Sequence, residues 1–178
     1  MKLRYRKADP LDDEDLRILM KGMNDPEIQH LVTPNFEEGP LSIVNLVDYR
    51  TSILASHIVN HQFIIFDGDR PIGDLSLMED PEHLFLRIPH SGWLGICISD
   101  GAYRGKGIGR QAMQFIENFA WDLGMVRVEL GVFSYNERAA NLYLKMGYHE
   151  IARIPNFVWY QERWWADIRM EKINPSQS

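Results

Sequence analysis

A glycine-rich segment with three cationic side chains contains the residue types that could bind a diphosphate. Residues 103–110 read Tyr-Arg-Gly-Lys-Gly-Ile-Gly-Arg, between an apolar run and an amphipathic helical pattern. Glycines at a helix start let an anion approach unpaired backbone N–H groups and the positive end of the helix dipole. Cations are supplied by Arg104, Lys106 and Arg110. The segment therefore predicts an anion site suited to a pyrophosphate.

Two common phosphate-binding motifs fit this segment poorly. The dinucleotide fingerprint requires a glycine where Arg110 stands, and the P-loop requires a serine or threonine where Gly107 stands. The pattern R-x-x-G-x-G does match, through Arg104, Gly107 and Gly109. Taken alone, the segment could also be an ordinary glycine turn that caps a helix among solvated charges.

A second segment carries a tyrosine that could act as an acid. Residues 136–148 read Asn-Glu-Arg-Ala-Ala-Asn-Leu-Tyr-Leu-Lys-Met-Gly-Tyr, where Asn136 suits a helix cap and Gly147 a helix stop. An unperturbed tyrosine has a pKa near 10, so Tyr143 would stay protonated at neutral pH and could donate to a departing thiolate. It shares a predicted helical face with Ala139, Ala140 and Met146.

The elements on either side of the glycine segment predict where these residues meet. Residues 93–98 predict a buried strand, and residues 126–132 alternate in the manner of a strand with one apolar face. A strand-helix-strand crossover is right-handed, so we expect these two strands to run parallel and close together in one sheet. Their carboxyl ends would face the helix start, where open α/β sheets bind ligands.

The remaining segments complete an α/β (α+β) fold. Further strands are expected at about 3–6, 63–66, 72–77, 148–157 and 162–172, and helices at about 12–23 and 44–58. The region of residues 27–40 is irregular. No repeat, low-complexity segment or linker interrupts the 178 residues, so we expect a single domain over 1–178.

Composition excludes several classes of function. Hydrophobic residues make up 45% of the chain, yet no apolar run is long enough to cross a bilayer and no secretory signal begins the chain, so we expect a cytoplasmic protein without a membrane partner. A single cysteine, Cys97, agrees with a reducing compartment. The net charge of -6 argues against nucleic acid and mildly favours a cationic substrate. His83 and His90 lack the paired spacing of a zinc site, so no metal is expected.

Together the two segments resemble the GNAT superfamily of N-acetyltransferases. The first is similar to the acetyl-CoA loop of that family, and the second to its pattern N-x-x-A-x-x-L-Y-x-K-x-G-F/Y. The resemblance covers residues 93–172 well and the amino-terminal half in outline. It is nearest in pattern to the branch with ribosomal-protein alanine acetyltransferases and spermidine acetyltransferases. The anchors present are Asn136, Ala139, Leu142, Tyr143, Lys145, Gly147 and Tyr148.

The resemblance implies a GNAT-like fold with a mixed sheet of about seven strands. The family's element order is strand, helix, helix, three strands, helix, strand, helix and two strands. It also implies direct transfer of acetyl from acetyl-CoA to a primary amine in a ternary complex, with CoA as product. The acceptor could be a polyamine, an aminoglycoside, an amino acid or a protein or peptide amino terminus.

The resemblance assigns roles to particular residues. Backbone N–H groups of residues 104–109 would bind the pyrophosphate, residues 96–98 would pair with the pantetheine arm, and Tyr143 would protonate the sulfur. The N–H of Cys97 or Ile98 could polarise the thioester carbonyl. The expected cofactor-binding residues are Ile96, Cys97, Ile98, Arg104, Gly105, Lys106, Gly107, Ile108, Gly109, Arg110, Asn136 and Tyr143.

The sequence leaves the proton acceptor open. Many relatives carry a glutamate on the strand before the loop, where this chain has Gly-Ile-Cys-Ile at 95–98. An acetylated Cys97 is disfavoured, because it lies in an apolar strand without a cue for an activating histidine. Relay through water or a backbone carbonyl could also suffice, because an amine can bind partly deprotonated. The conceivable side-chain acceptors are Asp74, Glu79, His83 and Glu129.

Several alternatives stay open at this point. A CoA-binding sensor without turnover would also lack the strand glutamate, and a nucleotide-phosphate enzyme would require the misfitting P-loop. Three glutamates near the irregular region could attract an amine or simply be solvated: Glu27, Glu37 and Glu38. An aromatic-rich end of the chain could form a homodimer or belong to the core: Trp159, Tyr160, Trp164 and Trp165.

Overall fold

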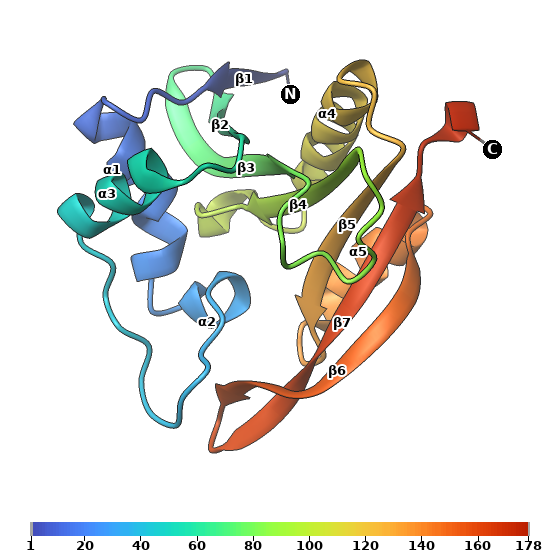
Figure 1. Cartoon of the computed structure of the whole chain (residues 1–178). Coiled ribbons are helices and arrows are strands. Elements are labelled where there is room, and N and C mark those ends of the chain that lie inside the picture. The colour runs from blue at the N-terminus through green and yellow to red at the C-terminus, as the bar shows by residue number, and fades with distance from the viewer. Residues whose placement is uncertain (1, 178) are drawn as a thin grey trace.

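The computed structural model describes residues 2–177 and has a seven-stranded sheet with helices on both faces (Figure 1). The strands are β1 (Leu3–Lys7), β2 (Asn60–Asp67), β3 (Arg70–Glu79), β4 (Ser91–Cys97), β5 (Arg127–Phe133), β6 (His149–Tyr160) and β7 (Arg163–Ile173). The helices are α1 (Asp13–Asn24), α2 (Gln29–Val32), α3 (Leu46–Ala55), α4 (Ile108–Asp122) and α5 (Glu137–Lys145). The predicted mixed α/β fold and its seven strands are confirmed.

The sheet opens between its two central strands. The strand order is β1-β2-β3-β4-β5-β7-β6, and the β4–β5 pair is parallel, as the crossover predicts. These two strands are in register only from Ser91 to Trp93, opposite Arg127 to Glu129. Beyond that point β4 continues along β3 and β5 continues along β7. A wedge therefore opens between residues 94–98 and residues 130–133.

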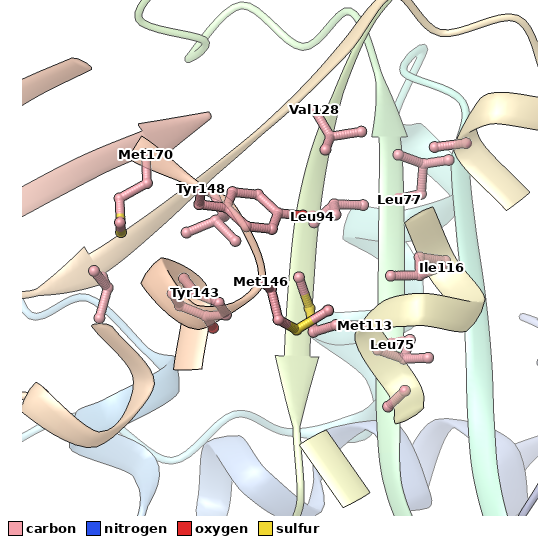
Figure 2. Close-up of a cluster of buried hydrophobic side chains, with 14 of the residues drawn as sticks. Leu75, Leu77, Leu94, Met113, Ile116, Val128, Tyr143, Met146, Tyr148 and Met170 are labelled. Atoms are coloured by element: carbon pink, nitrogen blue, oxygen red, sulfur yellow. The ribbon is translucent and has the colours of Figure 1, made fainter. Parts of the chain in front are cut away.

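Alternating side chains divide the molecule into two cores. Apolar residues on one face of the sheet pack against α4 and α5, as Figure 2 shows for Leu94, Met113 and Tyr143. The opposite face packs against α1 and α3 through a smaller cluster of four buried residues. These are Leu16, Leu19, Ile64 and Phe66. The wedge is thus approached from two faces with different neighbours.

The amino-terminal half has three helices instead of the expected two. The one-turn helix α2 lies in the stretch expected to be irregular. Helix α3 begins at Leu46 because Asn45 caps it, its side chain accepting the N–H of Asp48 at 2.9 Å. Val44, expected inside that helix, instead exchanges two hydrogen bonds of 2.8 Å with the Asn24 side chain.

Candidate active site

The glycine-rich segment forms the turn that leads from β4 into α4. Gly105 and Gly107 have φ angles of +81° and +78°, in the left-handed region that side chains rarely adopt. A Cβ added at Gly107 would meet no atom within 4 Å, so the space in front of the helix start is open. These glycines therefore allow the turn to form and also let a ligand approach the main chain closely.

Free backbone donors cluster at this turn. Within residues 2–177, the N–H groups of 105–110 donate no hydrogen bond. The neighbouring donors are satisfied, since Arg104 N–H bonds to the Gly101 carbonyl at 3.2 Å and Gln111 N–H to the Gly107 carbonyl at 3.3 Å. Free N–H groups at the positive end of a helix favour an anion. The turn thus has the donors that a diphosphate requires.

Two of the three predicted cations are held by protein carbonyls. The Arg104 guanidinium donates to Ile98 O at 2.9 Å and Ser99 O at 3.1 Å, and Arg110 donates to Lys145 O at 3.2 Å. Lys106 is exposed, with Nζ 5.8 Å from the centroid of the Tyr103 ring. Arg104 and Arg110 therefore fix the loop to the segment just after β4 and to the end of α5, rather than pointing freely at a ligand.

A further cation lies at this loop that was not predicted from the sequence. One guanidinium nitrogen of Arg138, on α5, lies 3.3 Å from the position that a Cβ on Gly105 would take. Arg138 is exposed and occupies an unspecified position of the second motif, so no sequence signal marked it. Its placement comes from the packing of α5 beside the loop.

One side of the wedge is formed by the residues predicted to bind the pantetheine arm. Ile96 and Ile98 are partly buried against the main core, and Cys97 is 8% exposed. The Cys97 sulfur packs directly against the backbone of Gly22 in α1. Burial raises the pKa of the thiol, so Cys97 lacks the thiolate character of a nucleophile.

Tyr143 lies in the core on the α5 side of the sheet. Its side chain is 7% exposed, and Figure 2 shows it with Met146 and Tyr148 near Leu94 of β4. Burial raises the pKa of Tyr143 to about 12, so the phenol is protonated at neutral pH. Asn136 caps α5 as predicted, accepting the Ala139 N–H at 3.2 Å. The phenol thus has the protonation state required of an acid.

Two of the conceivable proton acceptors are engaged by neighbours, and a third makes an aromatic contact. Glu129 accepts the N–H of Phe85 at 2.8 Å and the Arg127 guanidinium at 2.7 Å, and it is fully buried. Glu79 bonds to the His61 ring at 2.6 Å. Burial lowers the pKa of His83, whose ring packs edge-on to an indole. Glu79 and Glu129 are thus occupied by neighbours, whereas His83 is exposed and its ring makes no hydrogen bond within residues 2–177.

Asp74 is the fourth of those residues and differs from the others. Burial raises its pKa to about 8, and its Oδ2 is buried without a hydrogen-bond partner in the described chain. It lies on β3 opposite Cys97, so β4 separates it from the wedge. Its position therefore suits a structural carboxyl group better than a group in contact with a ligand.

A set of buried charges joins β5, β7 and the loop from β3 to β4. We name it the buried ion cluster. Arg127 contacts Glu129 and Glu171 at 2.7 and 2.6 Å. In the loop, the N–H groups of Phe85 and Leu86 donate to Glu129, and the Leu86 carbonyl accepts from Arg127. Its members are Arg127, Glu129, Asp167, Arg169 and Glu171.

A groove of about 670 Å³ lies between the α1–α2 region and the end of the β6–β7 hairpin. The His30 and Tyr160 rings stack there at 4.4 Å, and the Tyr135 phenol donates to the His30 carbonyl. Two carboxylates, of Glu27 and Glu162, also line it. Glu37 and Glu38 are exposed and do not line it. The groove therefore combines aromatic faces with negative charge.

The aromatic residues considered for a homodimer pack within their own hairpin. The Trp159 and Trp164 rings lie 5.5 Å apart, and the Trp165 indole donates to the Tyr160 carbonyl at 2.9 Å. All four are partly buried in the single chain. A homodimer stays a prediction.

Two absences within residues 2–177 bear on membrane proteins and metalloproteins. None of the helices formed by these residues is both long and apolar enough to cross a membrane. In the same part of the chain, no group of three or more His, Cys, Asp or Glu residues is placed to hold a metal ion.

Comparisons with known proteins agree with this architecture. The family model for the acetyltransferase (GNAT) family matches residues 27–148. The uncharacterized N-acetyltransferase YdgE of Bacillus subtilis (strain 168) is 49% identical over 47 residues, which cover 26% of this chain and 30% of that relative. This alignment thus spans less than a third of the relative's length.

Solved structures are similar over nearly the whole chain. Spermidine N-acetyltransferase from Vibrio cholerae, in complex with CoA and spermine, has a TM-score of 0.74 and 22% identity, covering 96% of this chain and 95% of that one. An N-acetyltransferase from Staphylococcus aureus Mu50 has a TM-score of 0.73 and 19% identity, covering 97% and 99%. At such identities the likeness concerns the fold.

Proposed function

Because this chain belongs to the acetyltransferase (GNAT) family, we propose that it transfers the acetyl group of acetyl-CoA to a primary amine. The observation that carries the proposal is the row of free N–H groups at residues 105–110, beside an open wedge. An anion site at a helix start, next to unpaired strand edges, matches a ligand with a diphosphate followed by an amide-bearing arm.

Acetyl-CoA fits the residues that form this site. The N–H groups of 105–110 would bind its diphosphate, with Lys106 and Arg138 as the nearby cations. Residues 96–98 would pair with the pantetheine amides in the manner of an added strand. Asn136 would bond to the arm near its reactive end. When bound, acetyl-CoA supplies a thioester that is activated toward amines.

The proposed transfer is direct, within a ternary complex. Cys97 is sealed beneath α1, which supports a mechanism without an acetylated enzyme. Tyr143 donates its proton to the departing sulfur, since the phenol is protonated at neutral pH. The backbone N–H of Cys97 or Ile98 polarises the thioester carbonyl.

A cationic amine fits the groove beside α2. Ring faces of Tyr135, Trp159 and Tyr160 can contact an ammonium group, and Glu27 and Glu162 can balance its charge. The net charge of -6 supports the same preference. A polyamine is therefore the first acceptor of interest, and a peptide amino terminus is the second. The Vibrio cholerae structure, which contains spermine, supports this order.

We further propose that residues 1–178 form one N-acetyltransferase domain of a cytoplasmic protein. A sheet that continues from β1 to β6 supports the single domain. The alternative is a CoA-binding sensor without turnover, favoured by the absence of a glutamate at 95–98. The buried, protonated Tyr143 favours the enzyme, since a sensor has no need of an acid at the sulfur.

The test is release of free thiol from acetyl-CoA in the presence of an amine panel. The panel would contain spermidine, an aminoglycoside, free amino acids and a short peptide with a free amino terminus. We expect thiol release well above hydrolysis for at least one amine, and fastest for a polycation. Tight CoA binding without amine-dependent thiol release would favour the sensor. Binding of ATP in preference to CoA would contradict both readings.

A further inference from the structure

Asp167 of β7 has a buried carboxylate oxygen without a partner. The side chain is 2% exposed, and its Oδ2 accepts from Arg169 Nε at 2.5 Å. Its Oδ1 has no hydrogen-bond partner among the described residues. Leaving a buried acceptor unpaired is energetically unfavourable, so such a group in a native fold requires an explanation. A bound ligand is one such explanation.

A glycine allows the carboxylate to sit beside the wedge. The two carboxylate oxygens of Asp167 lie 2.9 and 3.1 Å from the position that a Cβ on Gly131 would take, which is closer than an ordinary van der Waals contact. The tip of the Trp93 indole lies 3.0 Å from the same position. Gly131 lies two residues after Glu129, the last residue of β5 in register with β4. The carboxylate and the indole therefore meet where the sheet begins to open.

Asp167 and Tyr143 lie on opposite faces of the sheet. Leu130 and Val132 of β5 belong to the core that contains Tyr143, so the intervening Gly131 faces the other way. The Asp167 carboxylate lies over Gly131 and shares that second face. A thioester held in the wedge would thus have a phenol on one side and a carboxylate on the other.

We propose that Asp167 is the proton acceptor for the acceptor amine, with Oδ1 in contact with its ammonium group. This role rests on the proposed function. The ammonium gives one proton to Oδ1, and the nitrogen lone pair forms the bond to the acetyl carbonyl carbon. The C–S bond breaks, its electron pair leaves with sulfur, and sulfur takes the Tyr143 proton. The nitrogen gives its second proton to the phenolate, so one proton remains on Asp167 and passes to solvent.

The surroundings of Asp167 suit this role. Burial raises its pKa, the Arg169 cation opposes that shift, and the nearby Glu129 adds to it. A carboxylate with a raised pKa is a stronger base, while the contact with Arg169 keeps it oriented. Asp74 also has a raised pKa and an unpaired oxygen, but β4 lies between it and the wedge. Asp74 is therefore a matched control.

The test compares Asp167→Asn with Asp74→Asn, using the amine that turns over fastest in the panel. We expect Asp167→Asn to lower kcat at neutral pH by about 100-fold with little change in the KM for acetyl-CoA. The deficit should shrink between about pH 7 and about pH 10, because free amine then replaces the missing base. Asp74→Asn should keep most of its turnover and the wild-type pH profile.

A second variant tests the position of the Asp167 carboxylate without removing it. In Gly131→Ala, the new methyl group would displace the carboxylate and the Trp93 tip, and we expect a similar loss with similar recovery at high pH. Wild-type turnover in Asp167→Asn, a loss confined to the KM of the amine, or a larger loss in Asp74→Asn would each overturn the role of Asp167. No amine-dependent thiol release by the wild type would overturn the proposed function and this role with it.

Discussion

At the residue scale, Tyr143 shows how burial extends the pH range over which a phenol stays protonated. The phenol lies in the main core, and burial raises its pKa to about 12. An unperturbed phenol is already protonated at neutral pH, and desolvation extends that state to higher pH by making the phenolate unfavourable. The nearby Tyr148 ring, 5.8 Å away, belongs to the same core but is not proposed to contact the cofactor. Comparing the two tyrosines can therefore distinguish a proton donor from a residue that only packs in the core.

Replacing Tyr143 with phenylalanine should reduce turnover while sparing acetyl-CoA affinity. We expect kcat to fall by a factor of about 10 to 1000, because the sulfur loses its proton donor while the ring still packs. Steady-state kinetics and a CoA binding titration measure the two effects. Tyr148→Phe is the control and should keep wild-type turnover. Equal turnover in Tyr143→Phe and the wild type would remove the phenol from the mechanism.

The raised pKa of Tyr143 also predicts how stability depends on alkaline pH. Between about pH 10 and about pH 12 the unfolded chain releases a phenolic proton that the folded chain retains. The associated stability is complete below the unfolded pKa and is lost as pH rises through the folded pKa, up to about 3 kcal/mol. Tyr143→Phe should therefore show a smaller fall in the free energy of unfolding across this range. Urea denaturation at several pH values measures it, and identical slopes would contradict it.

At the element scale, the conformation of the chain at the start of α4 also determines whether a ligand can approach it. The left-handed conformation of Gly107 ends the turn and leaves its outer side open. Gly124, just beyond the other end of α4, has a similar φ of +82° and equally open surroundings. Both glycines thus require a left-handed conformation, but only Gly107 lies at the proposed diphosphate site.

This pair predicts a separation of stability from binding. Gly107→Ala and Gly124→Ala should each lower the free energy of unfolding by about 1–2 kcal/mol, since each forces a side chain into a left-handed conformation. Only Gly107→Ala should weaken acetyl-CoA binding, by about tenfold or more, because its methyl group would stand where the diphosphate approaches. Thermal unfolding and calorimetric titration measure the two effects. Equal binding by both variants would place the diphosphate elsewhere.

Local elements were predictable from the sequence, whereas long-range contacts were not. The turn, α4 and α5 follow from glycines, caps and apolar spacing within a few residues of each other. The engagement of Arg104 with two carbonyls depends on how the loop folds back on β4. Asp167 could not be placed from the sequence, because β7 inserts between β5 and β6 and pairs with residues over 30 positions away. The short α2 was missed because a single turn has little periodicity.

At the scale of the whole molecule, the buried ion cluster compensates for a sheet that is split at its centre. Direct pairing of β4 with β5 covers only three positions. Glu129 and Arg127 extend the connection by binding main-chain groups of Phe85 and Leu86, in the loop that leads into β4. The wedge can therefore stay open without separating the two halves of the sheet.

Breaking this cluster should cost far more than breaking an exposed ion pair. We expect Glu129→Gln to lower the free energy of unfolding by about 3–5 kcal/mol, because buried arginines lose a charged partner. Glu150→Gln removes an exposed contact with Arg153 and should cost about 0–1 kcal/mol. Chemical denaturation measures both. Similar costs for the two variants would show that the cluster contributes little to holding the halves together.

The seal over Cys97 has a practical consequence for any colorimetric study of this chain. The one sulfhydryl of the polypeptide is packed against the backbone of Gly22, so a thiol-reactive dye should not label the native protein. Colour would then report only coenzyme set free in solution, without a background from the catalyst itself. Adding detergent should reveal one further equivalent per polypeptide.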